Sequence, residues 1–188
     1  MTANPDSMNI AKTHSEFSSG DNAETNHADR LLDVEIIVHD KRWGEIEGLG
    51  ERLVDAIRRA RSLGGEEFCG PEEIACVLTN DEEVKDLNSK FRNQDKPTNV
   101  LSFSSDQQFE TLIVPQRTLG DIVLAYETIM AECKELGIPF VNHAMHLVVH
   151  GTLHILDYDH DTEAKSSEME NLEIVILSKL GISNPYVD

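Results

Sequence analysis

The 188-residue sequence has few cysteines and few basic residues. Its three cysteines, Cys69, Cys76 and Cys133, are widely spaced, so we expect reduced, mostly buried thiols and neither a disulfide framework nor a cysteine zinc site. The sequence contains 16 Lys and Arg residues but 35 Asp and Glu residues, which gives a formal net charge of −19. This balance argues against a broad surface that binds phosphate backbones nonspecifically, because such binding depends on clustered cations.

Long apolar runs and a secretory signal are also missing. No stretch of 18 apolar residues is present, so no contact with a membrane is expected. Residues 1–30 lack a basic segment, an apolar segment and a small-residue cleavage site, which favours a cytoplasmic location. Residues 1–31 are rich in polar and acidic residues without an apolar period, and we predict a disordered acidic tail. Residues 32–188 are of a size that fits one folded domain.

Strand and helix patterns alternate along residues 32–188. Apolar alternation or short apolar runs predict strands near 33–40, 73–80, 100–104 and 120–127, with a polar loop over 104–115. Apolar residues at helical spacing predict a helix over 43–63, and Asn80 is the expected N-cap of a short helix that ends near Phe91. From Glu127 onward three helical pieces are expected, with breaks near Gly137 and after His154. The predicted fold is α+β: a small mixed β-sheet covered by helices.

The segment HLVVHGTLHILDYDHD, residues 146–161, contains the pattern with the clearest chemistry. His150 and His154 are four residues apart, which places both imidazoles on one face of a helix in the C-terminal half of the fold. His160 follows six residues later, where a turn can bring it back as a third ligand. Three neutral imidazoles suit one Zn²⁺ ion and leave the fourth position to water, which is typical of a catalytic site.

Other roles for the histidines of this segment remain open. His143, His146, His150 and His154 all lie near one helical face, so some of them fit equally well as core histidines held by hydrogen bonds. His146 is a candidate for hydrogen bonding to a ligand or for carrying a proton. Gly151 stands where metzincin proteases carry their general base, so that mechanism is not expected, and the general base is unassigned.

The segment HGTLHILDYDH resembles the HGxLHLxGYDH signature of the YbeY family, with the three histidines in register. LNSKFRNQDKPTNVLSF, LGDIVLA and the C-terminal EMENLEIVILSKLGISNPY extend the resemblance over about residues 32–186. The resemblance implies a single-domain, zinc-dependent endoribonuclease that acts on single-stranded RNA. It further implies a role in 16S rRNA 3′-end maturation and ribosome quality control, with the 16S rRNA precursor and small-subunit ribosomal proteins or assembly factors as partners.

The resemblance also assigns residues. His150, His154 and His160 match the metal ligands, and Arg92 matches the functionally important arginine, expected to act in catalysis because a guanidinium can bind a phosphate through two hydrogen bonds. Lys90 and Lys96 are candidates for RNA binding. The sequence departs from the family pattern at two positions, where Ser104 replaces a frequent Pro and Asp157 replaces a Gly. Asp tolerates the left-handed conformation better than most residues, and Asp157 is a second candidate for hydrogen bonding to a ligand.

Two alternative functions are compatible with the same residues. One is a zinc hydrolase of amide or small phosphoester bonds, and the other is a non-catalytic ribosome-assembly module that zinc only stabilises. Trp43 and Phe91 are expected to be core residues rather than surfaces on which bases stack.

Overall fold

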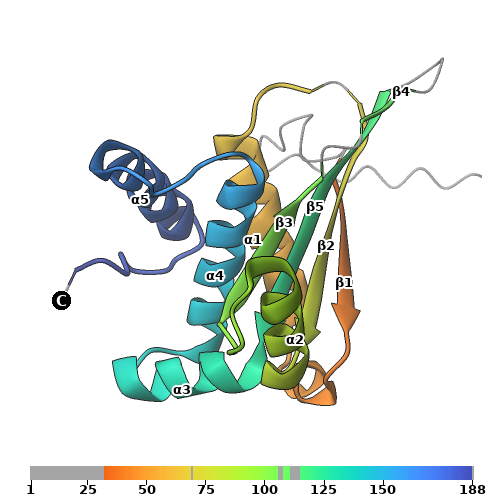
Figure 1. Cartoon of the computed structure of the whole chain (residues 1–188). Coiled ribbons are helices and arrows are strands. Elements are labelled where there is room, and N and C mark those ends of the chain that lie inside the picture. Colours follow the sequence, from red (N-terminus) through yellow and green to blue (C-terminus); the bar gives the residue numbers. More distant parts are fainter. Residues whose placement is uncertain (1–31, 69, 106–107, 111–114, 188) are drawn as a thin grey trace, which may run out of the picture.

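The computed structural model describes residues 32–68, 70–105, 108–110 and 115–187 (Figure 1). The predicted tail, residues 1–31, and Cys69 lie outside this part of the chain. The elements, in chain order, are β1 (Leu32–Val38), a 3₁₀ helix η2 (Lys41–Glu45), α1 (Leu49–Gly64), β2 (Glu72–Thr79), α2 (Asp81–Arg92), β3 (Val100–Ser104), β4 (Gln108–Glu110), β5 (Pro115–Ala125), α3 (Tyr126–Leu136), α4 (Phe140–Ile155) and α5 (Glu163–Lys179).

The strands form one mixed sheet with the order β1-β2-β5-β3, and β4 pairs with β5. β1, β2 and β5 run parallel. In their register, Ile36 of β1 lies beside Cys76 of β2, and Cys76 lies beside Ile122 of β5. β3 and β4 run antiparallel to β5. Helices cover this sheet (Figure 1), which confirms the α+β prediction of a small mixed sheet covered by helices.

The main core lies between one face of the sheet and the helices α1, α4 and α5. Ile122 and Leu124 of β5 point into it, whereas Val123 and Ala125 point to the opposite face, as the two-residue period of a strand requires. α4 is the most buried helix and packs beside β3 and β5 (Figure 1). A Cβ at Gly151 would lie 3.3 Å from Ile122, so the absence of a side chain allows α4 to approach the sheet. No helix in the described part of the chain is both long and apolar enough to cross a bilayer.

α2 packs on the opposite face of the sheet. Val84 contributes to a second, smaller apolar cluster with Leu101 and Val123, and Phe103 packs against this cluster. The predicted N-cap is confirmed, because the Asn80 side chain accepts a hydrogen bond from the backbone N–H of Glu83 at 3.0 Å. α2 and β3 together form a wall that faces the C-terminal half of α4.

The structure corrects three predicted boundaries. The helix expected over 43–63 is divided into η2 and α1, because the backbone is extended at Ile46 and Gly48, the N-cap of α1, adopts a left-handed φ of 68°. The last predicted strand ends at Ala125 rather than at Glu127, and Tyr126 begins α3. The predicted polar loop over 104–115 contains β4 and the start of β5. The three helical pieces expected in the C-terminal part are confirmed.

Buried thiols and Trp43 follow the predictions. Cys76 and Cys133 are free and buried, and burial raises the pKa of the Cys76 thiol to about 12. Trp43 is a core residue at 1% exposure, and its indole N–H donates to the carbonyl of Thr79 at 2.8 Å. Phe91 contradicts the core prediction, since 53% of this residue is exposed.

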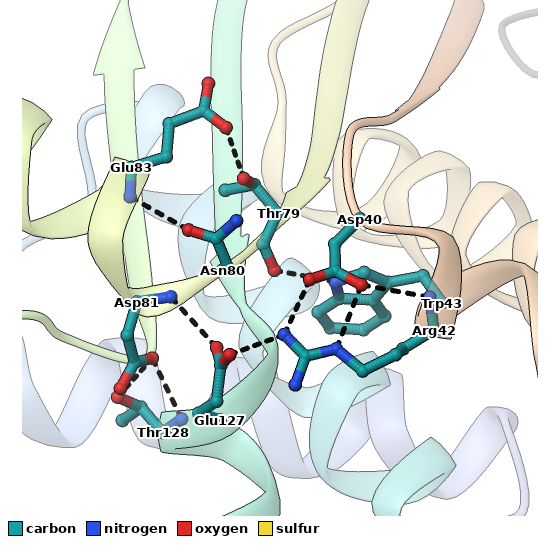
Figure 2. A network of polar contacts seen from close by, with 9 residues as sticks. All are labelled: Asp40, Arg42, Trp43, Thr79, Asn80, Asp81, Glu83, Glu127 and Thr128. Carbon is teal, nitrogen blue, oxygen red and sulfur yellow. Dashed lines mark hydrogen bonds and ion pairs between the residues drawn. The ribbon is translucent and has the colours of Figure 1, made fainter.

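A polar network joins η2, α2 and α3 where the parallel strands end (Figure 2). Arg42 forms ion pairs with Asp40 and Glu127, and Glu127 also accepts a hydrogen bond from the backbone N–H of Asp81 at 2.9 Å. Asp81 in turn accepts hydrogen bonds from the backbone and the hydroxyl of Thr128. Carboxyl ends of parallel strands are frequent ligand sites in α/β proteins. Here the polar side chains of Figure 2 hydrogen-bond to one another and hold the three elements together.

Candidate metal centre and cleft

Three histidines from the end of α4 and the segment that follows it meet at one point. One ring nitrogen each of His150, His154 and His160 lies within 4.8 Å of the other two. His150 and His154 occupy successive turns of α4, and their Nε2 atoms are 3.1 Å apart. The His160 ring lies 4.9 Å from that of His154, centroid to centroid. The predicted three histidines are therefore brought together, and their nitrogens can hold one metal ion.

The partners of the Nδ1 atoms fix the orientation of the first two rings. The Nδ1–H of His150 donates to a Glu173 carboxylate oxygen at 2.8 Å, and that of His154 donates to the Tyr158 carbonyl at 3.0 Å. Both acceptors lack a proton, so we assign the hydrogen to Nδ1 in each neutral ring. Both Nε2 atoms then present lone pairs to one another at 3.1 Å, an arrangement that a shared cation stabilises.

Glu173 of α5 is a site residue that the sequence reasoning missed. It is fully buried, and its carboxylate accepts hydrogen bonds from His150, from His146 at 3.0 Å and from the Tyr186 hydroxyl. Burial by itself raises the pKa of Glu173, but hydrogen bonds from His146, His150 and Tyr186 outweigh it and lower the pKa to about 2. A sequence signal was present, because Glu173 occupies the same face of α5 as the buried Met169, Ile176 and Leu177.

The other two histidines of α4 lie outside the trio. His146 hydrogen-bonds to Glu173 and so contacts the same carboxylate as His150. His143 instead forms a pair with Glu132 of α3 at 2.7 Å. His154 is half-buried, and burial together with the nearby His150 and His160 lowers its pKa. A lowered pKa favours the neutral imidazole that binds metals.

Asp157 shapes the turn that follows α4. Its φ is 69°, so the left-handed conformation anticipated for this position is present. The backbone N–H of Asp157 donates to the His154 carbonyl, and that of Tyr158 donates to the Leu153 carbonyl. These two bonds form a Schellman motif, which reverses the chain and places the Tyr158 carbonyl against His154. Asp157 therefore influences the position of His154 through the backbone turn that it forms.

We expect Asp157→Gly to stabilise the fold by about 1 kcal/mol, because glycine adopts the left-handed conformation without steric strain. Thermal unfolding of the metal-free protein measures this change. Asp161→Gly is the matched control, since it removes the same charge at a position without a positive φ. An Asp157→Gly protein that melts below the wild type would contradict the assignment of strain to this turn.

A cleft of about 980 Å³ contains the histidine trio. The end of α2, the loop 94–98 and β3 form one wall, and α4 with residues 157–160 forms the other. Arg92 lies on the first wall, and its Nη2 donates to the Ser102 carbonyl at 3.1 Å. Lys96 also lines the cleft, whereas Lys90 does not, and its ammonium lies 4.9 Å from the centre of the Phe91 ring. Cations on one wall, and on the other wall nitrogens that can hold a metal ion, suit a phosphate-containing substrate.

The family model and the curated relatives that match this chain name one family. Residues 38–181 match the model of the family described as endoribonuclease YbeY. A protein of Allorhizobium ampelinum named "Endoribonuclease YbeY" is 43% identical over 161 residues, covering 84% of this chain and 96% of the relative. One of the same name from Sinorhizobium fredii is 40% identical over 163 residues, covering 84% and 93%. A solution structure from Thermotoga maritima covers 83% of this chain and 100% of its own, at 21% identity and a TM-score of 0.47. The chain belongs to the YbeY endoribonuclease family.

Proposed function

We propose that residues 32–188 form a zinc-dependent endoribonuclease domain that cuts single-stranded RNA in the cytoplasm. Its substrate is the 16S rRNA precursor, its roles are 3′-end maturation and ribosome quality control, and its ligands for one Zn²⁺ are His150, His154 and His160. The observation that carries this proposal is the position of the histidine trio in a cleft whose opposite wall holds Arg92. Membership of an endoribonuclease family makes RNA the class of substrate.

The histidine trio suits zinc in donor type and spacing. Two nitrogens bound to one zinc at about 2.0–2.1 Å in a tetrahedral arrangement lie about 3.3 Å apart. The Nε2 atoms of His150 and His154 are 3.1 Å apart without any rearrangement. When bound there, zinc supplies Lewis-acid activation of water and of a phosphoryl oxygen.

Residues around the trio orient the ligands and bind the substrate. Glu173 and the Tyr158 carbonyl accept the Nδ1 protons, so the Nε2 lone pairs stay directed into the cleft. Arg92 is held against Ser102 by one N–H, and its remaining N–H groups are directed to a phosphate oxygen of the RNA. Lys96 adds positive charge on the same wall, and Lys90, which does not line the cleft but contacts the Phe91 ring, is the second candidate for RNA binding.

The net charge of −19 limits the affinity of the chain for RNA. With two cationic side chains among the residues that line the cleft, Arg92 and Lys96, intrinsic affinity for RNA is weak and sensitive to salt. We propose that small-subunit ribosomal proteins or assembly factors bring the enzyme to its substrate. Their contacts supply affinity that the cleft itself does not provide.

Reconstitution of the metal-free protein tests this function. The protein is stripped with a chelator, loaded with one equivalent of Zn²⁺ or of another divalent ion, and incubated with a 16S rRNA 3′ precursor fragment as a single strand or as a duplex. We expect cleavage of the single strand, highest with zinc. Zinc binding without cleavage of any RNA would reject the endoribonuclease, and turnover of an amide or small phosphoester instead would identify a different zinc hydrolase.

Replacing Arg92 with alanine separates the role of the cleft wall from that of the metal. We expect full zinc content but cleavage reduced by about 100-fold or more, because a positioned donor to transition-state charge contributes about 100- to 1,000-fold. Arg92→Lys should recover only part of this loss, since an ammonium is a point charge that cannot bind bidentately. Arg59→Ala, which removes an exposed arginine paired with Asp55 on α1, should cleave like the wild type. Wild-type cleavage by Arg92→Ala would remove Arg92 from the proposal.

A further inference from the structure

Phe91 is an exposed aromatic residue close to the histidine trio. It lies at the end of α2, 53% exposed, and lines the cleft that contains the histidine trio. An exposed phenylalanine forgoes the stabilisation that burial of its ring would provide. Single exposed apolar residues are ordinary, so exposure alone assigns no role. What distinguishes Phe91 is its position on the cleft wall next to Arg92.

β3 holds the Phe91 ring and the Arg92 guanidinium at neighbouring positions. The ring packs against Phe103 with centroids 5.3 Å apart and planes at 66°, and Arg92 donates to the carbonyl of the adjacent Ser102 at 3.1 Å. Both side chains are therefore anchored on consecutive residues of one strand. A ring fixed in this way loses little conformational entropy when a ligand binds to it.

The contact that covers the Phe91 ring is weak enough to be displaced. The Lys90 ammonium lies 4.9 Å from the ring centre, on a flexible and exposed side chain. An exposed cation–π contact corresponds to about 2- to 5-fold in an equilibrium constant. Stacking of a nucleic-acid base on an aromatic side chain corresponds to about 5- to 150-fold. A base that reaches the ring therefore competes successfully with Lys90.

We propose that Phe91 is a base-binding subsite, on which one unpaired base of the RNA stacks beside the phosphate held by Arg92. This inference rests on the proposed function, because it takes single-stranded RNA as the ligand. Stacking suits a protein of net charge −19, since it requires no cation and does not weaken with salt. It also favours single strands, whose bases are free to leave the stack, over duplexes.

The test compares Phe91→Leu with Phe91→Tyr and the wild type, all loaded with zinc, in binding to short single-stranded oligonucleotides. Leucine keeps an apolar contact with Phe103 but offers no ring, whereas tyrosine keeps the ring. We expect the Kd to rise about 5- to 150-fold for Phe91→Leu and to change less than about 3-fold for Phe91→Tyr. The salt dependence of binding should stay that of the wild type in both variants, whereas Arg92→Ala should lower its slope by about 0.7.

Oligonucleotides with one abasic residue locate the base. At the position that stacks on Phe91, removal of the base should weaken binding to the wild type but not to Phe91→Leu. If the wild type binds RNA and Phe91→Leu binds equally well, the subsite is rejected while the proposed function stands. If the wild type neither binds nor cleaves single-stranded RNA, the proposed function fails and the subsite fails with it.

Discussion

Replacement of His154 with alanine is expected to abolish both zinc binding and RNA cleavage. His154 is the central member of the trio, 3.1 Å from His150 between Nε2 atoms and 4.9 Å from the His160 ring between centroids. Loss of a hydrogen-bonding partner of a ligand already lowers metal affinity about 10- to 100-fold, so loss of the ligand itself should exceed 100-fold. Elemental analysis of the purified variant and gel assays of a single-stranded rRNA fragment measure the two effects.

His143→Ala is the matched control for this experiment. It removes a histidine from the same helix, but one that is paired with Glu132 and lies outside the trio. We expect this variant to retain one equivalent of zinc and to cleave RNA. Stoichiometric zinc in His154→Ala would place the metal elsewhere. Equal cleavage by His154→Ala and the wild type, both highly purified, would identify the activity as a contaminant.

The histidine trio was predictable because its geometry is local. A separation of four residues on a helix fixes the relation of His150 and His154, and the six-residue return to His160 needs one turn, which Asp157 provides with its left-handed backbone. Glu173 was not predicted, because its pairing with His150 depends on how α5 packs against α4, 23 residues away in sequence. Local periodicity indicates that a glutamate faces a core, but it does not indicate which histidine it meets.

The mixed sheet and the order of helices were predictable from apolar periods, whereas the extent of packing was not. Phe91 was expected in the core, and Val84, Leu87 and Phe91 do follow one helical period on α2. The first two pack against the smaller apolar cluster, but Phe91 extends into the cleft. A helical period shows which residues share a face, but not where the surface beneath that face ends.

Replacement of Glu173 with glutamine is expected to lower zinc affinity by about 10- to 100-fold. Three groups donate to this carboxylate, namely the His146 and His150 rings and the Tyr186 hydroxyl. A glutamine offers one acceptor oxygen and a donor NH₂ in the same space, so at least one donor loses its acceptor. The His150 ring then loses the negative partner that fixes its Nδ1 proton. Competition with a chromophoric chelator measures the affinity, independently of RNA cleavage.

The matched control is Glu132→Gln, which makes the same change in the pair that Glu132 forms with His143. Both substitutions remove a carboxylate that binds a histidine of α4, so both should lower the melting temperature of the metal-free protein. Of these two variants, Glu173→Gln alone should lower zinc affinity, because Glu173 contacts His150 of the trio whereas Glu132 is paired with His143. Equal zinc affinity in the two variants would mean that Glu173 stabilises the packing of α5 without orienting the metal ligand. A selective loss would show that the buried carboxylate of α5 prepares the metal centre before the ion arrives.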